Sequence, residues 1–252
     1  MGSGLVDFPI RKKSSAILPD NNPSGKIAYS RHRRRANADR SKDMTLAIIG
    51  TGNMAKGLAK VFSRAGNAVV FGSRDPSEAA SVARGFGDTV AAASIPEAVA
   101  KADMVFLAVP YDAVAAVVKA AGSLAGKIVV DLTNPMKADF SGLAIGFSTS
   151  AAEEIARLAP QAKVVKGFNT LFASVLQNGG EVAGTPATVL LAGDDADAVA
   201  EVGALVNSAG LKAIVAGPLA ASRNIEAVAA LNIGLGYGQG KGTDIAPTWV
   251  GI

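Results

Sequence analysis

The chain has 252 residues, a net charge of +4 and an apolar content of 49%. Ten of its 25 Lys and Arg residues, but only four of its 21 Asp and Glu residues, lie in residues 1–43. This segment therefore carries +6 and residues 44–252 carry −2, so the basic balance does not predict a nucleic-acid surface on the larger part. Cysteine is absent and the single histidine is His32, which excludes disulfides and thiol catalysis and leaves no obvious metal site in residues 44–252.

Residues 1–43 admit three interpretations. They are polar, contain Pro, Gly and Ser, and lack hydrophobic periodicity, which is typical of a disordered arm. A secretory signal is disfavoured by four acidic residues and by the lack of an apolar central run. Met44 lies directly before the first predicted strand, so a start codon assigned too far upstream is the third interpretation. We expect a basic extension over 1–43 and one folded domain over 44–252.

No apolar stretch reaches the roughly 18 residues that a membrane-spanning helix needs. We therefore expect a cytoplasmic protein without a membrane partner. Short β-branched runs alternate with helical patterns along the domain, which predicts a Rossmann-type α/β fold, a doubly wound and mostly parallel sheet with a small helical extension at the C-terminus. The predicted strands lie near 45–50, 68–72, 104–109, 127–131, 163–167, 188–192 and 211–215. The predicted helices lie near 53–65, 77–85, 95–101, 111–121, 150–158, 169–177, 195–208 and 219–234.

The first strand, turn and helix form the most informative stretch, TLAIIGTGNMAKGLA. A Gly-x-Gly-x-x-Ala turn at this place in a βαβ unit predicts a dinucleotide site. Gly50 permits a tight turn, and Gly52 lets a pyrophosphate approach the backbone, while Ala55 still allows close packing of helix on sheet. The helix N-terminus offers unpaired N–H groups to the phosphates. The predicted contacts are Gly50, Thr51, Gly52, Asn53, Met54 and Ala55, although Met54 also has the spacing of a core residue.

Ser73 and Arg74 end the second predicted strand, where an enzyme that uses NAD would usually carry Asp or Glu. A carboxylate there would accept hydrogen bonds from the ribose 2′-hydroxyl and repel a 2′-phosphate. A hydroxyl and a guanidinium do the reverse, because Arg pairs with phosphate through two hydrogen bonds. The pair predicts NADP, and a surface Arg at a turn is the alternative.

Four other strand ends are expected to face the cofactor, because ligands of open α/β sheets lie outside the carboxyl ends of the strands. They carry Val109-Pro110-Tyr111, Asn134, Asn169 and the segment 217–219. Asn134 either favours the turn before Pro135 or faces the nicotinamide. Asn169 reads as the N-cap of the helix predicted over 169–177. Arg223 is expected to pair with Glu226 one helical turn later or to meet an anionic ligand.

These segments together resemble the family of NADP-dependent oxidoreductases that use the deazaflavin coenzyme F420. The resemblance rests on IIGTGNMAKGLA, FGSRDP, LAVPY, DLTNP, KGFNT and AGPLAASR, and it runs from Met44 to about Gly236. The same fold occurs as the cytosolic reductase domain of membrane metalloreductases, which use flavin. The glycine-rich stretch GLGYGQGKG and the ending TDIAPTWVGI depart from the family pattern, and this tail either covers the acceptor pocket or packs in a dimer.

The resemblance implies direct hydride transfer between NADP(H) and F420, or FMN or FAD, with no catalytic side chain and with a homodimer as the assembly. Ala108, Val109 and Pro110 would lie along the nicotinamide, and Asn169, Thr170, Pro218 and Leu219 would edge the acceptor pocket. Two alternatives stay open. One is a pyrroline-carboxylate or imine-type reductase, although about 20 residues after Leu231 are too few for the large helical domain of that class. The other is a non-catalytic NADPH sensor.

Overall fold

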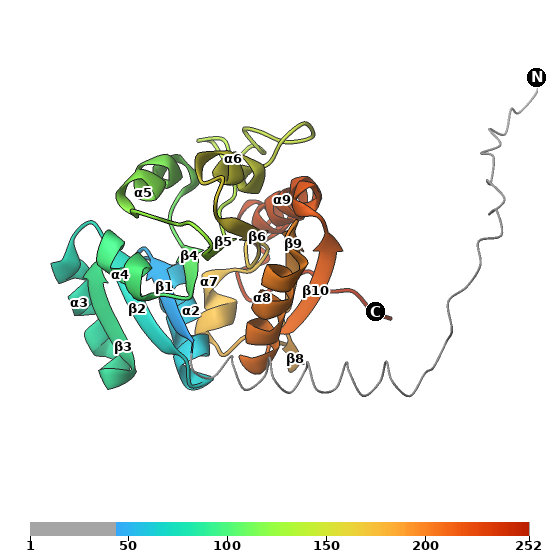
Figure 1. Cartoon of the computed structure of the whole chain (residues 1–252). Coiled ribbons are helices and arrows are strands. Elements are labelled where there is room, and N and C mark those ends of the chain that lie inside the picture. Colours follow the sequence, from blue (N-terminus) through green and yellow to red (C-terminus); the bar gives the residue numbers. More distant parts are fainter. Residues whose placement is uncertain (1–43, 252) are drawn as a thin grey trace, which may run out of the picture. The chain divides into compact units, whose positions relative to one another are not determined.

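The computed structural model describes residues 44–251, so the interpretations of residues 1–43 lie outside the described part. Residues 44–251 form an eight-stranded sheet in the order β10-β9-β6-β5-β4-β1-β2-β3, with helices on both faces (Figure 1). Its strands are β1 (Thr45–Ile49), β2 (Ala68–Ser73), β3 (Val90–Ser94), β4 (Met104–Leu107), β5 (Ile128–Asp131), β6 (Lys163–Lys166), β9 (Thr188–Gly193) and β10 (Lys212–Gly217). A separate antiparallel pair consists of β7 (Glu181–Val182) and β8 (Thr185–Pro186).

The helices cover the sheet in two layers because consecutive strand residues point to opposite faces. Ile48 and Phe106 pack with α2, α3, α7 and α8, whereas Ile49 and Leu107 pack with α4, α5 and α6 on the other face. The helices are α2 (Asn53–Arg64), α3 (Pro76–Ala83), α4 (Ile95–Lys101), α5 (Val114–Ala120), α6 (Ala151–Leu158), α7 (Ala173–Gln177), α8 (Ala196–Ser208) and α9 (Ser222–Ile233).

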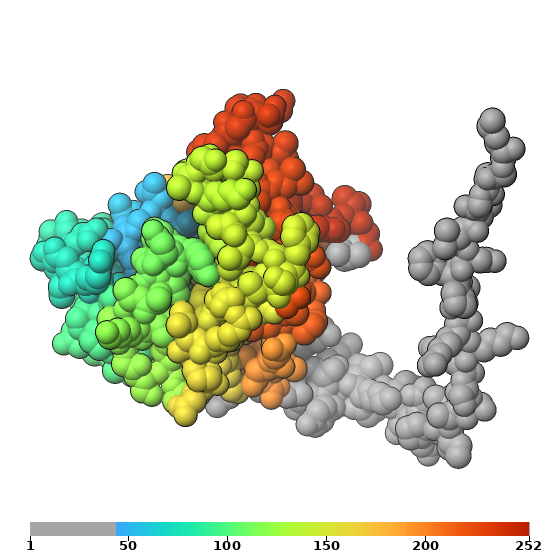
Figure 2. All heavy atoms as spheres, turned by 90° about the horizontal axis from the view of Figure 1, so that it is seen from above, coloured from blue at the N-terminus to red at the C-terminus, as the bar shows by residue number. Residues whose placement is uncertain are grey.

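The order of the strands determines where a ligand can lie. β1 pairs in parallel with β2 on one side and with β4 on the other, so the chain reverses its direction of winding between β1 and β4. This topological switch point opens a crevice at the carboxyl ends of both strands. The blue-to-green first part of the chain and the yellow-to-red second part lie on opposite sides of the molecule in the view from above (Figure 2).

The predicted fold class is confirmed, and each of the seven predicted strands is present. β9 runs antiparallel to β6, which makes the sheet mixed rather than fully parallel. The one strand of the sheet that the sequence did not predict is β3. Its sequence VAAAS is rich in alanine, which has low strand propensity, and the segment becomes a strand because it pairs with β2 at the edge of the sheet.

The prediction that Asn169 caps a helix over 169–177 is wrong. Helix α7 begins at Ala173 and its N-cap is Phe172. Phe168 has a φ of +64°, a left-handed conformation, and the N–H of Leu171 donates to the Phe168 carbonyl at 3.0 Å. This tight turn follows β6 directly and holds Asn169 and Thr170 at the strand end instead of in the first helical turn.

Candidate functional site

The turn between β1 and α2 has the backbone that its glycines predict. Gly50 has a φ of +122°, and a Cβ at this position would lie 2.4 Å from the Ala108 carbonyl oxygen. Only glycine therefore allows β1 to turn this close to β4. Gly52, the N-cap of α2, has an ordinary φ of −72°, and a Cβ there would meet no protein atom within 4 Å. The open space beside Gly52 is where a phosphate group could approach the helix N-terminus.

A pocket of about 660 Å³ extends from this turn to the end of β2. Arg74 is exposed and makes no ion pair within residues 44–251. Asp75 caps α3 and accepts from the N–H of Ser77 at 2.9 Å, so its carboxylate is turned toward the helix. The pocket is lined by Ile49, Gly50, Thr51, Gly52, Gly72, Ser73, Arg74, Asp75, Glu78, Ile95, Ala108, Val109, Pro110, Ala113, Ala116 and Val117. It brings the predicted NADP residues Thr51, Ser73 and Arg74 together.

One contact in this pocket was not expected. The Thr51 hydroxyl donates to Glu78 Oε1 at 2.6 Å, although the two residues are 27 positions apart in the chain. Glu78 lies in the first turn of α3, where a carboxylate is favoured by the helix dipole. The end of β2 itself carries Ser73 and Arg74 in place of the Asp or Glu that is usual in NAD enzymes. A carboxylate, that of Glu78, nevertheless lines the same pocket.

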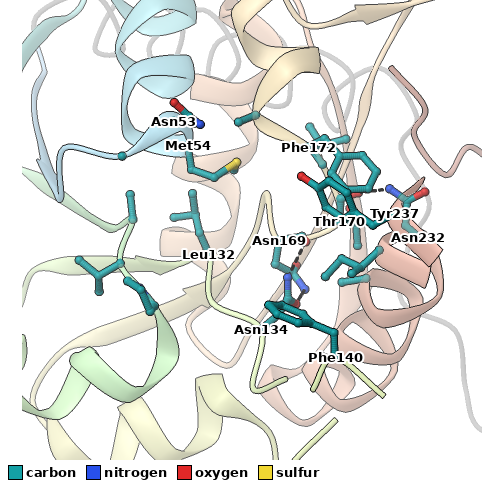
Figure 3. A pocket seen from close by; sticks show the side chains of 18 residues that line it. Asn53, Met54, Leu132, Asn134, Phe140, Asn169, Thr170, Phe172, Asn232 and Tyr237 are labelled. Carbon is teal, nitrogen blue, oxygen red and sulfur yellow. Dashed lines mark hydrogen bonds between the residues drawn. The ribbon is translucent and has the colours of Figure 1, made fainter. Parts of the chain in front are cut away.

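A second cavity, of about 430 Å³, lies on the other side of the β4 strand end. It shares Gly52, Ala108, Val109 and Pro110 with the first pocket, so the two spaces meet at the switch point. Its other lining residues come from three later segments and from the start of α2. They are Asn53, Met54, Leu132, Asn134, Phe140, Asn169, Thr170, Leu171, Phe172, Ala173, Ala229, Asn232, Ile233 and Tyr237 (Figure 3).

Asn134 and Asn169 join two walls of this cavity (Figure 3). Asn134 Nδ2 donates to the Asn169 carbonyl at 2.9 Å, and Asn169 Nδ2 donates to Asn134 Oδ1 at 2.9 Å. Asn169 Oδ1 and Thr170 Oγ1 are buried and have no hydrogen-bond partner among the described residues. Buried polar atoms without a partner are costly, so these two oxygens are candidates for accepting a hydrogen bond from a ligand.

Beneath the cavity, a fully buried lysine joins two strand ends to α9. Lys166 Nζ donates to Asp131 Oδ2 at 2.8 Å, to Glu226 Oε1 at 2.8 Å and to the Thr133 carbonyl at 2.6 Å. Asp131 Oδ1 also accepts from the Thr133 N–H at 2.8 Å, so both backbone groups of Thr133 are held directly before Asn134. Burial raises the pKa of the Glu226 carboxyl, an effect that the neighbouring Lys166 opposes. We call Asp131, Lys166 and Glu226 the buried ion network.

Two predictions about the segment after β10 are not supported. Pro218 and Leu219 are not among the residues that line the cavity. Leu219 is buried in the core on the α4, α5 and α6 face of the sheet, and its N–H donates to Asp194 Oδ1 at 2.8 Å. Arg223 does not pair with Glu226. It donates to both carboxylate oxygens of Glu153, at 2.6 and 2.9 Å, because α6 packs against α9 at this point.

The cavity wall that sequence reasoning assigned to Pro218 and Leu219 is built instead by α9 and the turn after it. Asn232 Nδ2 donates to the Thr170 carbonyl at 3.1 Å, and the Tyr237 ring meets Phe172 edge to face at 5.4 Å. A Cβ at Gly236 would lie 2.6 Å from the Phe172 ring, so glycine is required for this approach. In the sequence, the glycine-rich stretch GLGYG was the one feature that could have indicated this wall of the cavity. No sequence feature indicated that Phe140, on the loop after β5, would line the cavity.

Comparison with known proteins agrees with this geometry. The family model "NADP oxidoreductase coenzyme F420-dependent" matches residues 45–135, the part that contains β1 to β5. The F420-dependent NADP reductase of Methanothermobacter thermautotrophicus is 33% identical over 76% of this chain and 89% of its own length. The chain belongs to the F420-dependent NADP reductase family. It is an NADP-dependent oxidoreductase, as predicted from the turn and from Ser73 and Arg74.

Solved structures support the family membership and the fold. A putative F420-dependent NADP reductase from Arthrobacter sp. FB24 is 31% identical, with a TM-score of 0.74 over 82% of this chain and 99% of that one. Among relatives found by sequence, the rat metalloreductase STEAP3 is 32% identical over 73% of this chain. The matched part covers about a third of the length of STEAP3. A reductive aminase from Aspergillus terreus, at 22% identity and a TM-score of 0.57, shares the fold alone.

Two further findings bear on this family member. Within residues 44–251, no group of three or more His, Cys, Asp or Glu side chains is arranged to hold a metal ion. In the same range, no helix combines the length and the apolar character that a bilayer crossing requires.

Proposed function

We propose that this chain transfers a hydride between NADP(H) and a planar acceptor, the deazaflavin F420 or a flavin such as FMN or FAD. One observation carries the proposal: the two pockets share Gly52 and the segment Ala108–Pro110. A dinucleotide lying along the first pocket would reach the shared segment with its nicotinamide end. The second cavity then lies beside that end and offers space for the acceptor.

The chain's own residues divide the binding work between the two pockets. Gly50, Gly52 and the N-terminus of α2 would hold the pyrophosphate, and Ser73 with Arg74 would hold the 2′-phosphate. Asn53, Met54 and Ala55 begin the same helix. Asn53 is exposed, Met54 is half-buried and lines the second cavity, and Ala55 is buried against the sheet. Asn134 would orient the nicotinamide against Ala108, Val109 and Pro110.

The second cavity fits a ring system that carries N–H groups. Asn169 Oδ1 and Thr170 Oγ1 supply two acceptors that no other described residue uses. Phe140 and Tyr237, which are 69% and 70% exposed, offer aromatic surface at the rim. Aromatic stacking and a few placed polar atoms are the usual means of holding a planar ligand.

The cavity has little capacity for acid–base catalysis. Tyr237 is the one ionisable side chain among its lining residues. A bound deazaflavin or flavin supplies a ring that accepts or donates a hydride without help from a side-chain acid. The chain's part is then to hold two rings in contact and to exclude water, which agrees with the lack of histidine and cysteine in residues 44–252.

We also propose a homodimer that forms on the side of β10. This strand ends the sheet, and an unpaired edge with apolar side chains favours association. Val215 on β10 is 61% exposed, Leu231 on α9 is 64% exposed and Leu235 is 40% exposed. Light scattering after gel filtration would measure the mass, and a monomer at micromolar concentration would contradict the proposal. The cytoplasmic location stays a prediction that cell fractionation would test.

Anaerobic oxidation of NADPH with F420, FMN, FAD and riboflavin in turn would test the hydride-transfer proposal. We expect turnover with at least one of them. Tight binding of NADPH without turnover on any acceptor would overturn the proposal and favour an NADPH sensor. Turnover on cyclic imines alone would favour the imine-reductase alternative.

A pair of variants localises the acceptor. Phe140→Ala removes an aromatic ring from the cavity, and Phe147→Ala removes one from the same loop outside the cavity, where the side chain is fully exposed. We expect Phe140→Ala to raise KM for the acceptor roughly 2- to 10-fold, the scale of one aromatic contact, with the Kd of NADPH unchanged. Phe147→Ala should change neither quantity. Equal effects of both variants would place the acceptor elsewhere.

A further inference from the structure

Glu78 occupies a position that conflicts with NADP as the dinucleotide. Its carboxylate lines the same pocket as Ser73 and Arg74, and it accepts the Thr51 hydroxyl at 2.6 Å. The conflict has two parts, one of hydrogen bonding and one of charge. Both concern the 2′-phosphate that Ser73 and Arg74 are expected to bind.

The hydrogen-bonding conflict arises because a threonine hydroxyl has a single proton. While Thr51 donates that proton to Glu78, it cannot donate it to a phosphate oxygen. A phosphate that takes Thr51 as a donor must displace Glu78 from it. The contact therefore lowers the number of donors that the pocket offers to the 2′-phosphate.

The charge conflict arises because the carboxylate and the 2′-phosphate have the same sign. Arg74 forms no ion pair with Glu78 or with any other residue of 44–251, although two carboxylates, those of Asp75 and Glu78, line the same pocket. The Asp75 carboxylate accepts from backbone and side-chain groups of Ser77, whereas Glu78 accepts from Thr51 inside the proposed binding turn. Glu78 reduces the net attraction that Arg74 creates for a phosphate. An unmodified ribose 2′-hydroxyl would find the opposite situation, since a carboxylate is a good acceptor for it.

We propose that Glu78 is a specificity-determining residue, which weakens NADP(H) binding and supports binding of NAD(H) in the same pocket. The inference rests on the proposed function in placing the dinucleotide along this pocket. The pocket combines Arg74, a group that selects NADP, with Glu78, a group that selects NAD. We therefore expect this family member to bind both dinucleotides, with a smaller preference for NADP(H) than Arg74 alone would create.

The test compares the Kd of NADPH and of NADH in Glu78→Gln, measured by the fluorescence of the bound nicotinamide. Glutamine keeps an acceptor for Thr51 and removes the charge. We expect NADPH to bind roughly 3- to 30-fold more tightly, because a like charge near the phosphate is lost. NADH should bind more weakly, by a smaller factor. Asp88→Asn, an exposed change on the neighbouring turn and outside the pocket, controls for the overall charge.

A double-mutant cycle of Glu78→Ala with Thr51→Val separates the two parts of the conflict, because alanine removes the acceptor as well as the charge. If the hydrogen bond contributes, Glu78→Ala will have a smaller effect on NADPH when Thr51 is replaced. Equal effects in both backgrounds would assign the selectivity to charge alone, which still supports the proposal.

The outcomes distinguish this inference from the proposed function. If Arg74→Ala weakens NADPH and Glu78→Gln changes neither dinucleotide, the inference is overturned and the pocket assignment stands. If Arg74→Ala also leaves the Kd of NADPH unchanged, the dinucleotide does not bind along this pocket and both proposals are wrong. Thermal unfolding of each variant confirms that it is folded before binding is measured.

Discussion

The two pockets that meet at the end of β4 are built in different ways. Most residues of the proposed dinucleotide pocket, which extends from the β1–α2 turn to the end of β2, come from one stretch, residues 49–78, with the rest from 95–117. The proposed acceptor cavity, on the other side of the β4 strand end, draws on five segments spread between residues 52 and 237. The first pocket is thus largely a consequence of local βαβ geometry, whereas the second exists only when both ends of the domain have folded together.

The two pockets also depend on different forces. The dinucleotide pocket relies on backbone shape at Gly50 and on exposed side chains such as Arg74. The acceptor cavity relies on buried polar contacts, above all on the ion network that holds Thr133 and α9. Substitutions of exposed side chains in the first pocket should therefore affect ligand affinity, whereas changes at Gly50 or in the residues beneath the second pocket should affect stability. Four changes test this division, from the largest expected effect to the smallest.

Lys166→Met should have the largest effect, because it leaves the Asp131 and Glu226 carboxylates buried without a cation. Removing one member of a buried ion pair costs roughly 3–5 kcal/mol in the free energy of unfolding. Urea denaturation would measure the loss. The control is Lys163→Met on the same strand, whose 3.0 Å pair with Asp195 is solvent-exposed and should contribute little to the free energy of unfolding. Similar losses in the two variants would contradict a special role for the buried ion network.

Gly50→Ala should come next, since its Cβ would overlap the Ala108 carbonyl and its φ of +122° is unfavourable for alanine. Backbone strain of this kind costs about 1–3 kcal/mol, and we expect lost stability together with lost NADPH binding. The matched change, Gly52→Ala, meets no protein atom and should cost about 1 kcal/mol or less in stability.

The Kd of NADPH then separates the roles of the two glycines. In Gly52→Ala the new methyl group enters the space assigned to the pyrophosphate, so we expect about tenfold weaker binding, or about 1.4 kcal/mol, in a normally folded protein. Unchanged affinity in Gly52→Ala would mean that the phosphates do not approach this turn.

Arg74→Asp should weaken NADPH binding by roughly 1.5–3 kcal/mol, the scale of a hydrogen bond to a charged group. NADH affinity should change little or improve, because the new carboxylate can accept the ribose hydroxyl. Stability should be unaffected, since Arg74 is exposed and unpaired within residues 44–251. Calorimetric titration with both dinucleotides would measure the change. A retained preference for NADPH would remove Arg74 from the 2′-phosphate site.

Arg223→Gln should have the smallest effect and should depend on pH. Hydrogen bonds from Arg223 hold the pKa of the Glu153 carboxyl below its usual 4.5. A lowered pKa in the folded state stabilises the protein above the unfolded value, and this stabilisation disappears as the pH falls through the folded value. The loss should be about 1 kcal/mol or less at pH 7 and should shrink below pH 4.5. Arg157→Gln, which removes the more exposed pair with Glu154, should do less.

The sequence predicted the fold, the tight turn at Gly50 and the position of the second strand because their signals are local. The spacing of Gly50, Gly52 and Ala55 needs only one strand and one helix to be meaningful, and Ser73 and Arg74 follow the next strand directly. The same local reasoning failed at Asn169. Whether a residue caps a helix depends on where the helix starts. Phe168 adopts a left-handed conformation that forms a turn before the helix, so α7 begins only at Ala173.

Long-range pairing accounts for the other errors and omissions. Arg223 met Glu153, 70 residues away, and Glu226 met Lys166, 60 residues away. The sequence offered a nearer partner, Glu226 for Arg223, and short separation along a helix suggested the pair. Glu78 was likewise missed, because its contact with Thr51 forms only after β1 and β2 have paired.

From the opening βαβ unit, the sequence by itself predicted an NADP-dependent oxidoreductase, and the family membership confirms that prediction. The backbone conformation at a glycine and the identity of the residues at a strand end depend on only a few neighbouring positions. They can therefore be predicted without knowing which distant segments pack against them. The acceptor cavity was decided by tertiary structure. Its walls come from segments that meet only when β5, β6 and α9 are joined by buried charges, and no local pattern encodes which distant groups will be buried together.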